Sequence, residues 1–276
     1  MTKSLTALAL AALAAVPAHA AVSLTADDLD YSQSFDTLAT TGTANPWAND
    51  STLVGWSLIK ANSTAPAPVY SAGIGNSNTG SFYSFGSTNS TDRALGGIAS
   101  SNATGYWGTV TPGTTAGHIA LSLQNNTGKS IDSFTLAYTG EQWRDGGATT
   151  GAAQSMNVQY GFGSSFANVA TWSNLDSLTF TSPTFTAPSA GASLNGNAAA
   201  NRNTGLTQTV QSLDWSTGST LWVRWIEVNN AGNDHGLAVD DVAFSATVSA
   251  VPEPQTYALM LGGLGLVGWM ARRRKA

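Results

Sequence analysis

The interior of this chain alternates small polar residues with β-branched and aromatic ones, and it shows almost no helical periodicity. Between residues 21 and 250, serine and threonine alternate with apolar side chains, and glycine, asparagine and proline separate the runs. This pattern is typical of many short strands joined by turns. It predicts an all-β fold, a single jelly-roll-type β-sandwich. The clearest predicted strands are His118–Leu123, Ile131–Tyr138, Met156–Tyr160, Thr207–Leu213, Leu221–Val228 and Leu237–Phe244.

Local patterns add detail to two of these segments. The run from Leu221 to Val228 alternates strictly enough to assign two faces. One face carries Leu221, Val223 and Trp225, and the other carries Trp222, Arg224 and Ile226. The segment 125–128, Asn-Asn-Thr-Gly, is predicted to be a hairpin turn, because asparagine and glycine accept the positive φ that such a turn requires.

Composition excludes several classes of protein. The 276 residues include no cysteine, which excludes a disulfide framework, a thiolate zinc site and a cysteine nucleophile. Five of the 11 basic residues lie at the extreme ends of the chain. Residues 21–251 therefore carry six Lys and Arg against 15 Asp and Glu, a net charge of −9. A body without a basic face cannot bind nucleic acid through phosphate contacts, so no nucleic-acid partner is expected.

The N-terminus has the parts of a secretory signal peptide. Lys3 supplies a positive start, 5–16 is rich in leucine and alanine, and Pro17 precedes a small-residue cleavage site formed by Ala18 and Ala20. We therefore expect residues 1–20 to form an apolar helix that signal peptidase removes.

The C-terminus carries a short apolar stretch followed by a basic cluster. Residues 257–271 are mainly apolar and precede Arg272, Arg273 and Arg274. As a helix, this stretch rises about 22 Å, short of a hydrocarbon core of about 30 Å, so the flanking residues must help it to span the membrane. The arginines are expected to stay in the cytoplasm, which places the body outside.

A Pro-Glu-Pro motif precedes that stretch. Pro252, Glu253 and Pro254, the apolar helix and the arginine cluster follow one another in this order. Together, residues 251–276 resemble the PEP-CTERM sorting signal of Gram-negative bacteria. The resemblance implies that an inner-membrane exosortase recognises the motif, cuts near it and releases the body to the cell surface or the extracellular space. The alternative is an ordinary single-span C-terminal anchor.

Motifs in the body carry a second resemblance. The segments 138–144, 221–225 and 236–242, with Asn125 and Arg93 before them, are similar to a β-sandwich module of bacterial secreted proteins. The resemblance spans about residues 30–248 and implies a jelly-roll body of the carbohydrate-binding-module type, for which we expect the bounds 21–250. Such modules accompany catalytic domains in some secreted enzymes. None is recognisable beside this one, so the resemblance implies no catalytic activity.

Acidic residues allow a hydrolase as an alternative. Glycosidases need two carboxyl groups that face one cleft. The chain offers many pairs, but sequence alone does not give their separation; the candidates are Glu141, Asp145, Glu227, Asp234, Asp240 and Asp241. We expect Glu141 to pair with Arg144, which would lower its pKa and disfavour a role as general acid.

Asp240 and Asp241 also suggest a metal site. A last strand of the form Val-Asp-Asp-Val, together with Asp36 near the start of the body, resembles the structural calcium site of carbohydrate-binding modules. Calcium prefers such hard oxygen ligands. The alternative is that the two aspartates only end a strand or pair with an arginine. We weigh these two interpretations evenly.

Tryptophan residues beside turns are the candidates for sugar contacts, because sugar rings stack on exposed aromatic faces. Trp47, Trp107 and Trp172 lie beside turns and are predicted to be exposed. His118 opens an apolar strand and is predicted to be structural, and His235 is assigned to a solvated turn.

These observations predict a non-catalytic, exosortase-processed surface or extracellular-matrix protein. Its expected ligands are exopolysaccharide and calcium. Two alternatives stay open, a secreted polysaccharide hydrolase and a purely structural biofilm or sheath component.

Overall fold

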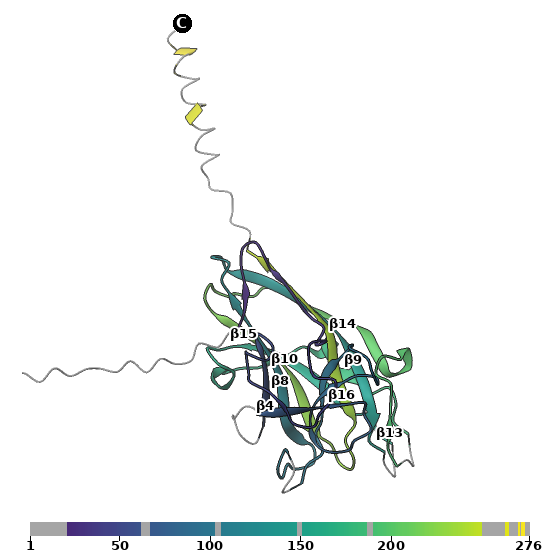
Figure 1. Ribbon diagram of the computed structural model, residues 1–276. Coiled ribbons are helices and arrows are strands. Elements are labelled where there is room, and N and C mark those ends of the chain that lie inside the picture. The colour runs from purple at the N-terminus through teal and green to yellow at the C-terminus, as the bar shows by residue number, and fades with distance from the viewer. Residues whose placement is uncertain are drawn as a thin grey trace, which may run out of the picture.

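The computed structural model describes residues 21–61, 67–102, 106–147, 151–186, 190–249, 263–264, 270 and 272–273. Two β-sheets face each other in this body (Figure 1). The helical segments among residues 21–249 that the structure describes are short 3-10 turns. The predicted all-β, jelly-roll-type sandwich is confirmed. The predicted signal peptide, with Ala18 and Ala20, lies outside the described residues.

The first sheet has seven strands, and its central strands are β8 and β15. The path runs β1-β8-β15-β10-β11, with β4 added beside β8 and β12 beside β10. On one side, β8 pairs with β15 over ten residue pairs, and on the other it pairs with β4 and then in parallel with β1. The bounds are β1 Val22–Leu24, β4 Trp56–Lys60, β8 Thr114–Asn125, β10 Ser155–Phe162, β11 Ser173–Asn174, β12 Phe180–Thr181 and β15 Thr220–Asn229.

The second sheet has nine strands in the order β13-β9-β16-β7-β6-β5-β3, with β14 beside β9 and β2 beside β16. The bounds are β2 Asp30–Gln33, β3 Asn45–Pro46, β5 Val69–Gly73, β6 Ser81–Phe85, β7 Ala94–Ile98, β9 Ile131–Asp145, β13 Ala192–Ser193, β14 Arg202–Val210 and β16 Gly236–Val248. Three 3-10 turns connect strands, namely η1 Phe166–Asn168, η2 Asp176–Leu178 and η3 Ala199–Asn201.

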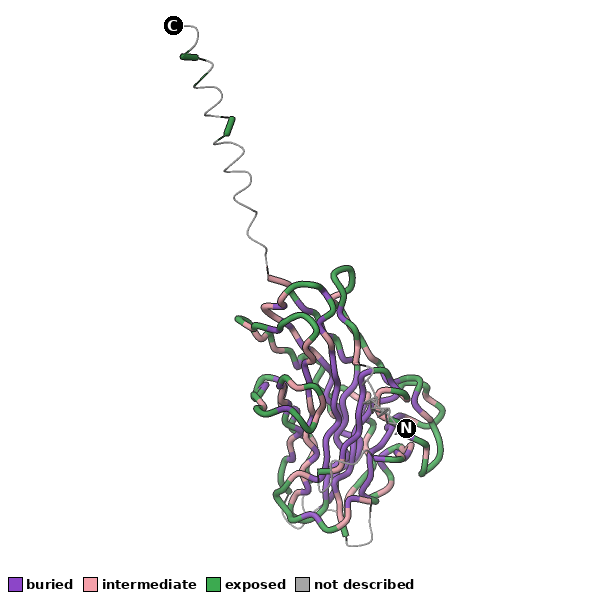
Figure 2. Tube along the Cα trace, turned by 90° about the vertical axis from the view of Figure 1, so that its left-hand side faces the viewer, coloured by how far each residue is buried: buried purple, intermediate pink, exposed green. Residues whose placement is uncertain are grey.

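Aromatic side chains fill the space between the sheets. Trp225 of β15 stacks on Trp56 of β4 with ring centroids 5.5 Å apart, and Phe35 meets Trp56 edge-on at 4.8 Å. All three rings are fully buried. Figure 2 shows buried segments running through the middle of the molecule, with many exposed residues in the loops around them. Apolar burial of this kind is the main source of stability for a chain without disulfides.

Strand β16 changes partner halfway along its length. Val239 pairs with β7, whereas Val242 pairs with β2 on the same side of the strand. The register against β9 on the other side shifts between Asp240 and Ala243, and Asp241 has a φ of 47° there. This irregularity is a β-bulge that lets one strand hold two successive neighbours.

The six strands predicted from the alternation are all present, with different ends in most cases. The prediction of Thr207–Leu213 starts too late, because β14 begins at Arg202. The hairpin prediction at 125–128 is wrong, since β8 and β9 lie in different sheets. That segment instead carries the chain from one sheet to the other, with the Asn125 side chain buried and donating to the carbonyl of Trp215.

Only part of the C-terminal segment lies within the described residues. Residues 263–264, 270 and 272–273 are helical, and Arg272 and Arg273 are exposed. Among the residues that the structure describes, no helix has the length and apolarity needed to cross a membrane. Pro252, Glu253, Pro254 and Arg274 lie outside the described residues.

Candidate functional site

The outer face of the nine-stranded sheet carries a row of aromatic rings. Tyr83 and Phe85 of β6 stack with centroids 4.9 Å apart, and Phe85 stacks in turn on Trp143 of β9 at 6.1 Å. The alternation of β6 puts these rings outside, because Phe82 of the same strand belongs to the core between the sheets. The three rings are buried even so, which means that other parts of the chain cover them.

The link between β5 and β6, residues 74–80, helps to form this cover. Strands β5 and β6 are parallel, so no tight hairpin can join them, and the link crosses the outer face instead. The Arg144 guanidinium donates to the carbonyl of Gly75 at 3.1 Å, and the Tyr83 hydroxyl donates to the carbonyl of Thr79 at 2.7 Å. Gly75 has a φ of 77° and packs directly on the backbone of Trp143, where a side chain would clash.

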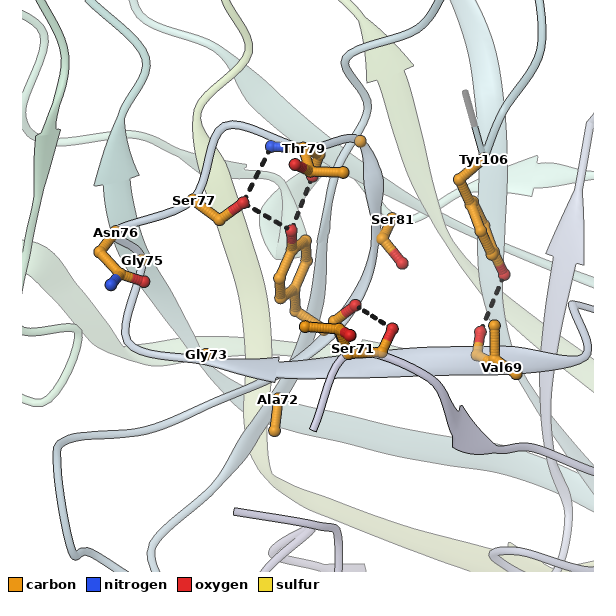
Figure 3. Close-up of a pocket in the computed structure, with 13 residues that line it drawn as sticks. Val69, Ser71, Ala72, Gly73, Gly75, Asn76, Ser77, Thr79, Ser81 and Tyr106 are labelled. Atoms are coloured by element: carbon orange, nitrogen blue, oxygen red, sulfur yellow. Dashed lines mark hydrogen bonds between the residues drawn. The ribbon is translucent and has the colours of Figure 1, made fainter. Parts of the chain in front are cut away.

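A pocket of about 390 Å³ opens between this link, strands β5 and β6, and Tyr106. Figure 3 shows Tyr106 on one side of the pocket and Gly75, Asn76 and Ser77 on the other, with Ser71 and Ser81 between them. The lining residues are Thr43, Val69, Ser71, Ala72, Gly73, Gly75, Asn76, Ser77, Thr79, Gly80, Ser81, Tyr83 and Tyr106.

Tyr106 is held firmly at the mouth of this pocket. Its hydroxyl donates to the carbonyl of Val69 at 3.0 Å, and its ring meets Phe82 and Trp107 edge-on. The Lys60 ammonium lies 5.3 Å from the centre of the Tyr106 ring and donates to the Tyr106 carbonyl at 3.1 Å. The half-buried ring is therefore fixed in position before any ligand arrives.

The pocket combines apolar surface with neutral hydrogen-bonding groups. Its side-chain polar atoms are hydroxyls and one amide, and none of the lining residues is acidic or basic. Burial raises the pKa of both Tyr83 and Tyr106, so their phenols stay protonated near neutral pH. A pocket with fixed aromatic rings and many neutral hydrogen-bonding groups suits an uncharged, polyhydroxylated ligand.

The predicted tryptophan contacts take other positions. Trp47 and Trp107 are 5% and 0% exposed, so the prediction that they are exposed is wrong. Trp107 lies in the core, where its indole N–H donates to the carbonyl of Ile98 at 2.8 Å. Trp172 is partly exposed; it precedes β11 of the seven-stranded sheet, packs near Trp222 and does not line this pocket. The sequence analysis did not single out Tyr106 as a site residue. The hydroxyl-rich stretch 71–83, which also lines the pocket, was the feature of the sequence that indicated this site.

The three predicted calcium ligands differ in their surroundings. The Asp36 carboxylate accepts the backbone N–H of Arg93 at 3.0 Å, and both Asp36 and Asp241 are exposed. Asp240 is buried, which raises its pKa to about 9. In the described part of the chain, no three histidine or acidic side chains form a group that could hold a metal ion. The described residues give the calcium prediction no geometric support, and it stays a prediction.

Two other interpretations of single residues change. Glu141 does not pair with Arg144; it accepts the indole N–H of Trp143 at 2.8 Å, and burial raises its pKa to about 7. His235 is buried rather than solvated, with its ring 3.2 Å from the amide of Gln142 and 3.5 Å from the carboxylate of Asp145.

His118 is buried, in agreement with the structural role predicted for it. Its exposed fraction is 8%, and burial, followed by the charge of Arg224, lowers its pKa to about 3. A histidine held in the neutral form at all physiological pH values does not switch charge there.

Two carboxyl groups do not meet in any of five hollows of the described surface. Two hollows other than the pocket contain one acid each, Asp30 and Asp241, and a small one contains Asp145. A larger hollow of about 560 Å³ beside Ala21 and Trp222 contains none. Glycosidase chemistry requires two carboxyl groups across one cleft, and none of these five hollows provides them.

Comparison with protein families identifies the C-terminal segment. Residues 250–275 match the PEP-CTERM protein-sorting motif. The chain therefore carries a sorting motif of exosortase substrates, and the resemblance inferred from Pro252, Glu253 and Pro254 is confirmed. The motif indicates export and processing by an exosortase. No curated protein matches the chain.

Solved structures similar to the body include carbohydrate-binding modules. A structure described as "CBM4 structure and function" has a TM-score of 0.33 and 13% identity, over 70% of this chain and 86% of that one. A family 35 carbohydrate-binding module from an environmental isolate has a TM-score of 0.23 and 14% identity, over 71% and 98%. A Clostridium thermocellum xylanase with CBM22 and GH10 modules, complexed with xylohexaose, has a TM-score of 0.31 and 7% identity, over 72% and 27%. This chain thus spans about a quarter of that enzyme.

Proposed function

We propose that the protein is exported, released at the cell surface by an exosortase, and binds a neutral glycan without cleaving it. The observation that carries this proposal is the uncharged pocket of about 390 Å³ between the 74–80 link and Tyr106. Its fixed tyrosine ring offers a stacking face, and its serine, threonine and asparagine side chains offer hydrogen bonds to hydroxyl groups. An exported location would bring this pocket to extracellular polysaccharide.

Removing either side of the pocket should weaken glycan binding. We expect Tyr106→Ala to reduce the affinity of the full-length chain for its best neutral oligosaccharide at least tenfold, because the stacking face is lost. Asn76→Ala should reduce it less, since Asn76 is exposed and contributes only hydrogen bonds. Binding is measured by calorimetry after screening immobilised gluco-, xylo- and galacto-oligosaccharides.

The matched control is Phe185→Ala, which removes an aromatic ring that is 48% exposed and lies outside this pocket. Its affinity should stay within twofold of wild type. If no neutral oligosaccharide binds, or if the Tyr106 and Asn76 variants bind as tightly as the control, the proposal is wrong, and the structural-component alternative gains support. Release of shorter sugars from the ligand would instead favour the hydrolase alternative.

The sorting motif has its own test. Changing Pro252, Glu253 and Pro254 to alanine should leave the unprocessed chain in the inner membrane of an exosortase-containing host, because the processing enzyme loses its recognition motif. Fractionation and immunoblotting of the tail and body measure the outcome. Alanine at Gln255 and Thr256 is the control and should not change release. Normal release of the triple variant would contradict exosortase processing at this motif.

A further inference from the structure

Arg224 lies in a cage of aromatic and amide groups on the outer face of the seven-stranded sheet. It belongs to the face of β15 that points away from the core between the sheets, on the side of Trp222. Its guanidinium carbon is 3.9 Å from the ring centre of Trp172 and 5.9 Å from that of Phe166. Both aromatic residues are partly exposed, and so is Arg224.

The neighbouring strands hold the guanidinium in one orientation. Gln159 pairs with Arg224 across β10 and β15, and its side-chain oxygen accepts from Nε at 2.9 Å and from Nη2 at 2.5 Å. The amide nitrogen of Gln159 donates to the side-chain oxygen of Asn174 on β11 at 2.8 Å. Three adjacent strands therefore fix the plane of the guanidinium, which is the arrangement that two-point recognition of a planar anion requires.

Part of this guanidinium has no protein acceptor. Among the described residues, Nη1 makes no hydrogen bond, and it is not one of the buried polar atoms without a partner, so it reaches solvent. No Asp or Glu of the described chain forms an ion pair with Arg224. His118, the other titratable group beside it, is buried and neutral.

In the part of the chain that the structure describes, no nearby acid counters the burial of Arg224, whereas the charge of Asp92 partly counters the burial of Arg93. Residues 21–251 contain 15 acidic side chains and only six basic ones, yet this cation has no acidic neighbour to offset its burial. Desolvation alone lowers the pKa of Arg224 to about 10, a cost that a nearby carboxylate would reverse. Stacking on Trp172 offsets some of that cost, but a ring cannot accept the hydrogen bonds that Nη1 offers.

We propose that Arg224 binds the carboxylate of an acidic glycan, such as a uronic acid residue. Nη1 would donate to the carboxylate, and the edges of Trp172 and Phe166 would contact the sugar ring. This inference rests on the proposed glycan-binding function but uses a separate site on the opposite sheet. The net charge of −9 repels a polyanion at long range, but salt at physiological concentration screens that repulsion beyond about 8 Å and leaves the local contact in place.

The test compares two forms of one polymer. Oligogalacturonate carries a carboxylate on each sugar, and its methyl ester has the same backbone without the charge. We expect the full-length chain to bind the carboxylate form at least tenfold more tightly than the ester. Titration followed by NMR should shift the Arg224 Nε–H signal, a change that a purely structural arginine would not show.

Substitutions locate the site. Arg224→Gln should reduce affinity for oligogalacturonate at least tenfold, and Arg224→Lys should give an intermediate loss, because it keeps the charge without the planar fork. Lys129→Gln removes the same charge from an exposed position elsewhere and should change affinity less than twofold. Melting temperatures of all variants show whether they fold. If Arg224→Gln does not fold, the NMR shift of Arg224 and the affinity of the Arg224→Lys variant still test whether Arg224 binds the carboxylate.

Each outcome has one meaning. Equal binding of the acid and the ester, or wild-type affinity in a folded Arg224→Gln variant, would overturn the carboxylate site. Tyr106→Ala should leave oligogalacturonate binding unchanged. If the wild-type chain binds no neutral glycan but binds oligogalacturonate in an Arg224-dependent way, the pocket is contradicted and this site is not. If the wild-type chain binds a neutral glycan through Tyr106 but does not prefer the carboxylate polymer, only this site is contradicted.

Discussion

The thermal stability of the wild-type chain is expected to fall as pH rises from about 5 to about 8. Replacing Glu227 by glutamine should make this fall smaller. Glu227 is 5% exposed, lies on the core face of β15 and approaches Gly97 of the opposite sheet. Its Oε1 atom has no hydrogen-bond partner. Burial, followed by the charge of Asp234, raises the pKa of Glu227 to about 8. The fold therefore holds this carboxyl in its neutral form.

The direction of the effect follows from proton binding. An unfolded glutamate titrates near pH 4.3, so between about pH 4.3 and pH 8 the folded chain keeps a proton that the unfolded chain releases. Stability is fully present below this window, falls as pH rises through it, and levels off above about pH 8. The loss is on the order of a few kcal/mol, or roughly 5–15 °C in Tm for a body of this size.

Calorimetric melting of the full-length chain between pH 5 and pH 9 measures this effect. Glu227→Gln should melt above wild type at pH 8 and show a shallower slope, with a remainder from Glu141 and Asp240, whose pKa values burial also raises. Asp27→Asn removes an exposed carboxyl and should keep the wild-type slope. A Glu227→Gln variant with the unaltered slope would show that this carboxyl is charged in the fold.

Replacing Trp56 by alanine is expected to cost the body about 3–5 kcal/mol. Trp56 is fully buried, stacks on Trp225 and meets Phe35 edge-on, so alanine leaves a cavity between the sheets. Its indole N–H also donates to the hydroxyl of Tyr31 at 2.7 Å, and this bond between β4 and β2 links the two sheets. Tm should fall by roughly 6–20 °C, measured by thermal melting at pH 6.

Two further variants make this result specific. Trp56→Phe retains a ring in the stack and should lose less stability than Trp56→Ala. Phe185→Ala removes a ring that is 48% exposed and should change stability by no more than about 0.5 kcal/mol. A Trp56→Ala variant as stable as Phe185→Ala would mean that the sheets close over the vacated space at no cost.

Alternation along single strands predicted the fold well, because burial on one face of a strand is a local property. The two faces of β15 are as expected: Val223 lies in the core between the sheets and Arg224 on the outer face. Pairing partners are not local, and this explains the error at Asn125. A turn that joins two sheets contains the same asparagine and glycine residues as a turn that joins two strands of one sheet.

Site residues were harder to predict for the same reason. Trp107 lies in a turn, but its indole N–H donates to the carbonyl of Ile98 at the end of β7, and nothing in the neighbouring sequence indicates that contact. Tyr106 lines a pocket only because the 74–80 link crosses above β6, a consequence of the parallel pairing of β5 with β6. Trp172 is partly exposed as expected, and its partner Arg224 comes from a strand about 50 residues away, which only the register of β15, β10 and β11 brings near.

The central place of β16 in the nine-stranded sheet ties folding to the order of synthesis. Gln33 of β2, near the start of the body, pairs with Val242 of β16. Strands β7 and β9 also pair with β16, so their pairing cannot be complete until this last strand is available. Only Ser249 separates Val248, the end of β16, from the sorting motif at 250–275. The nine-stranded sheet therefore closes only when the residues beside the motif are available, and pairings between such distant parts of a chain form slowly.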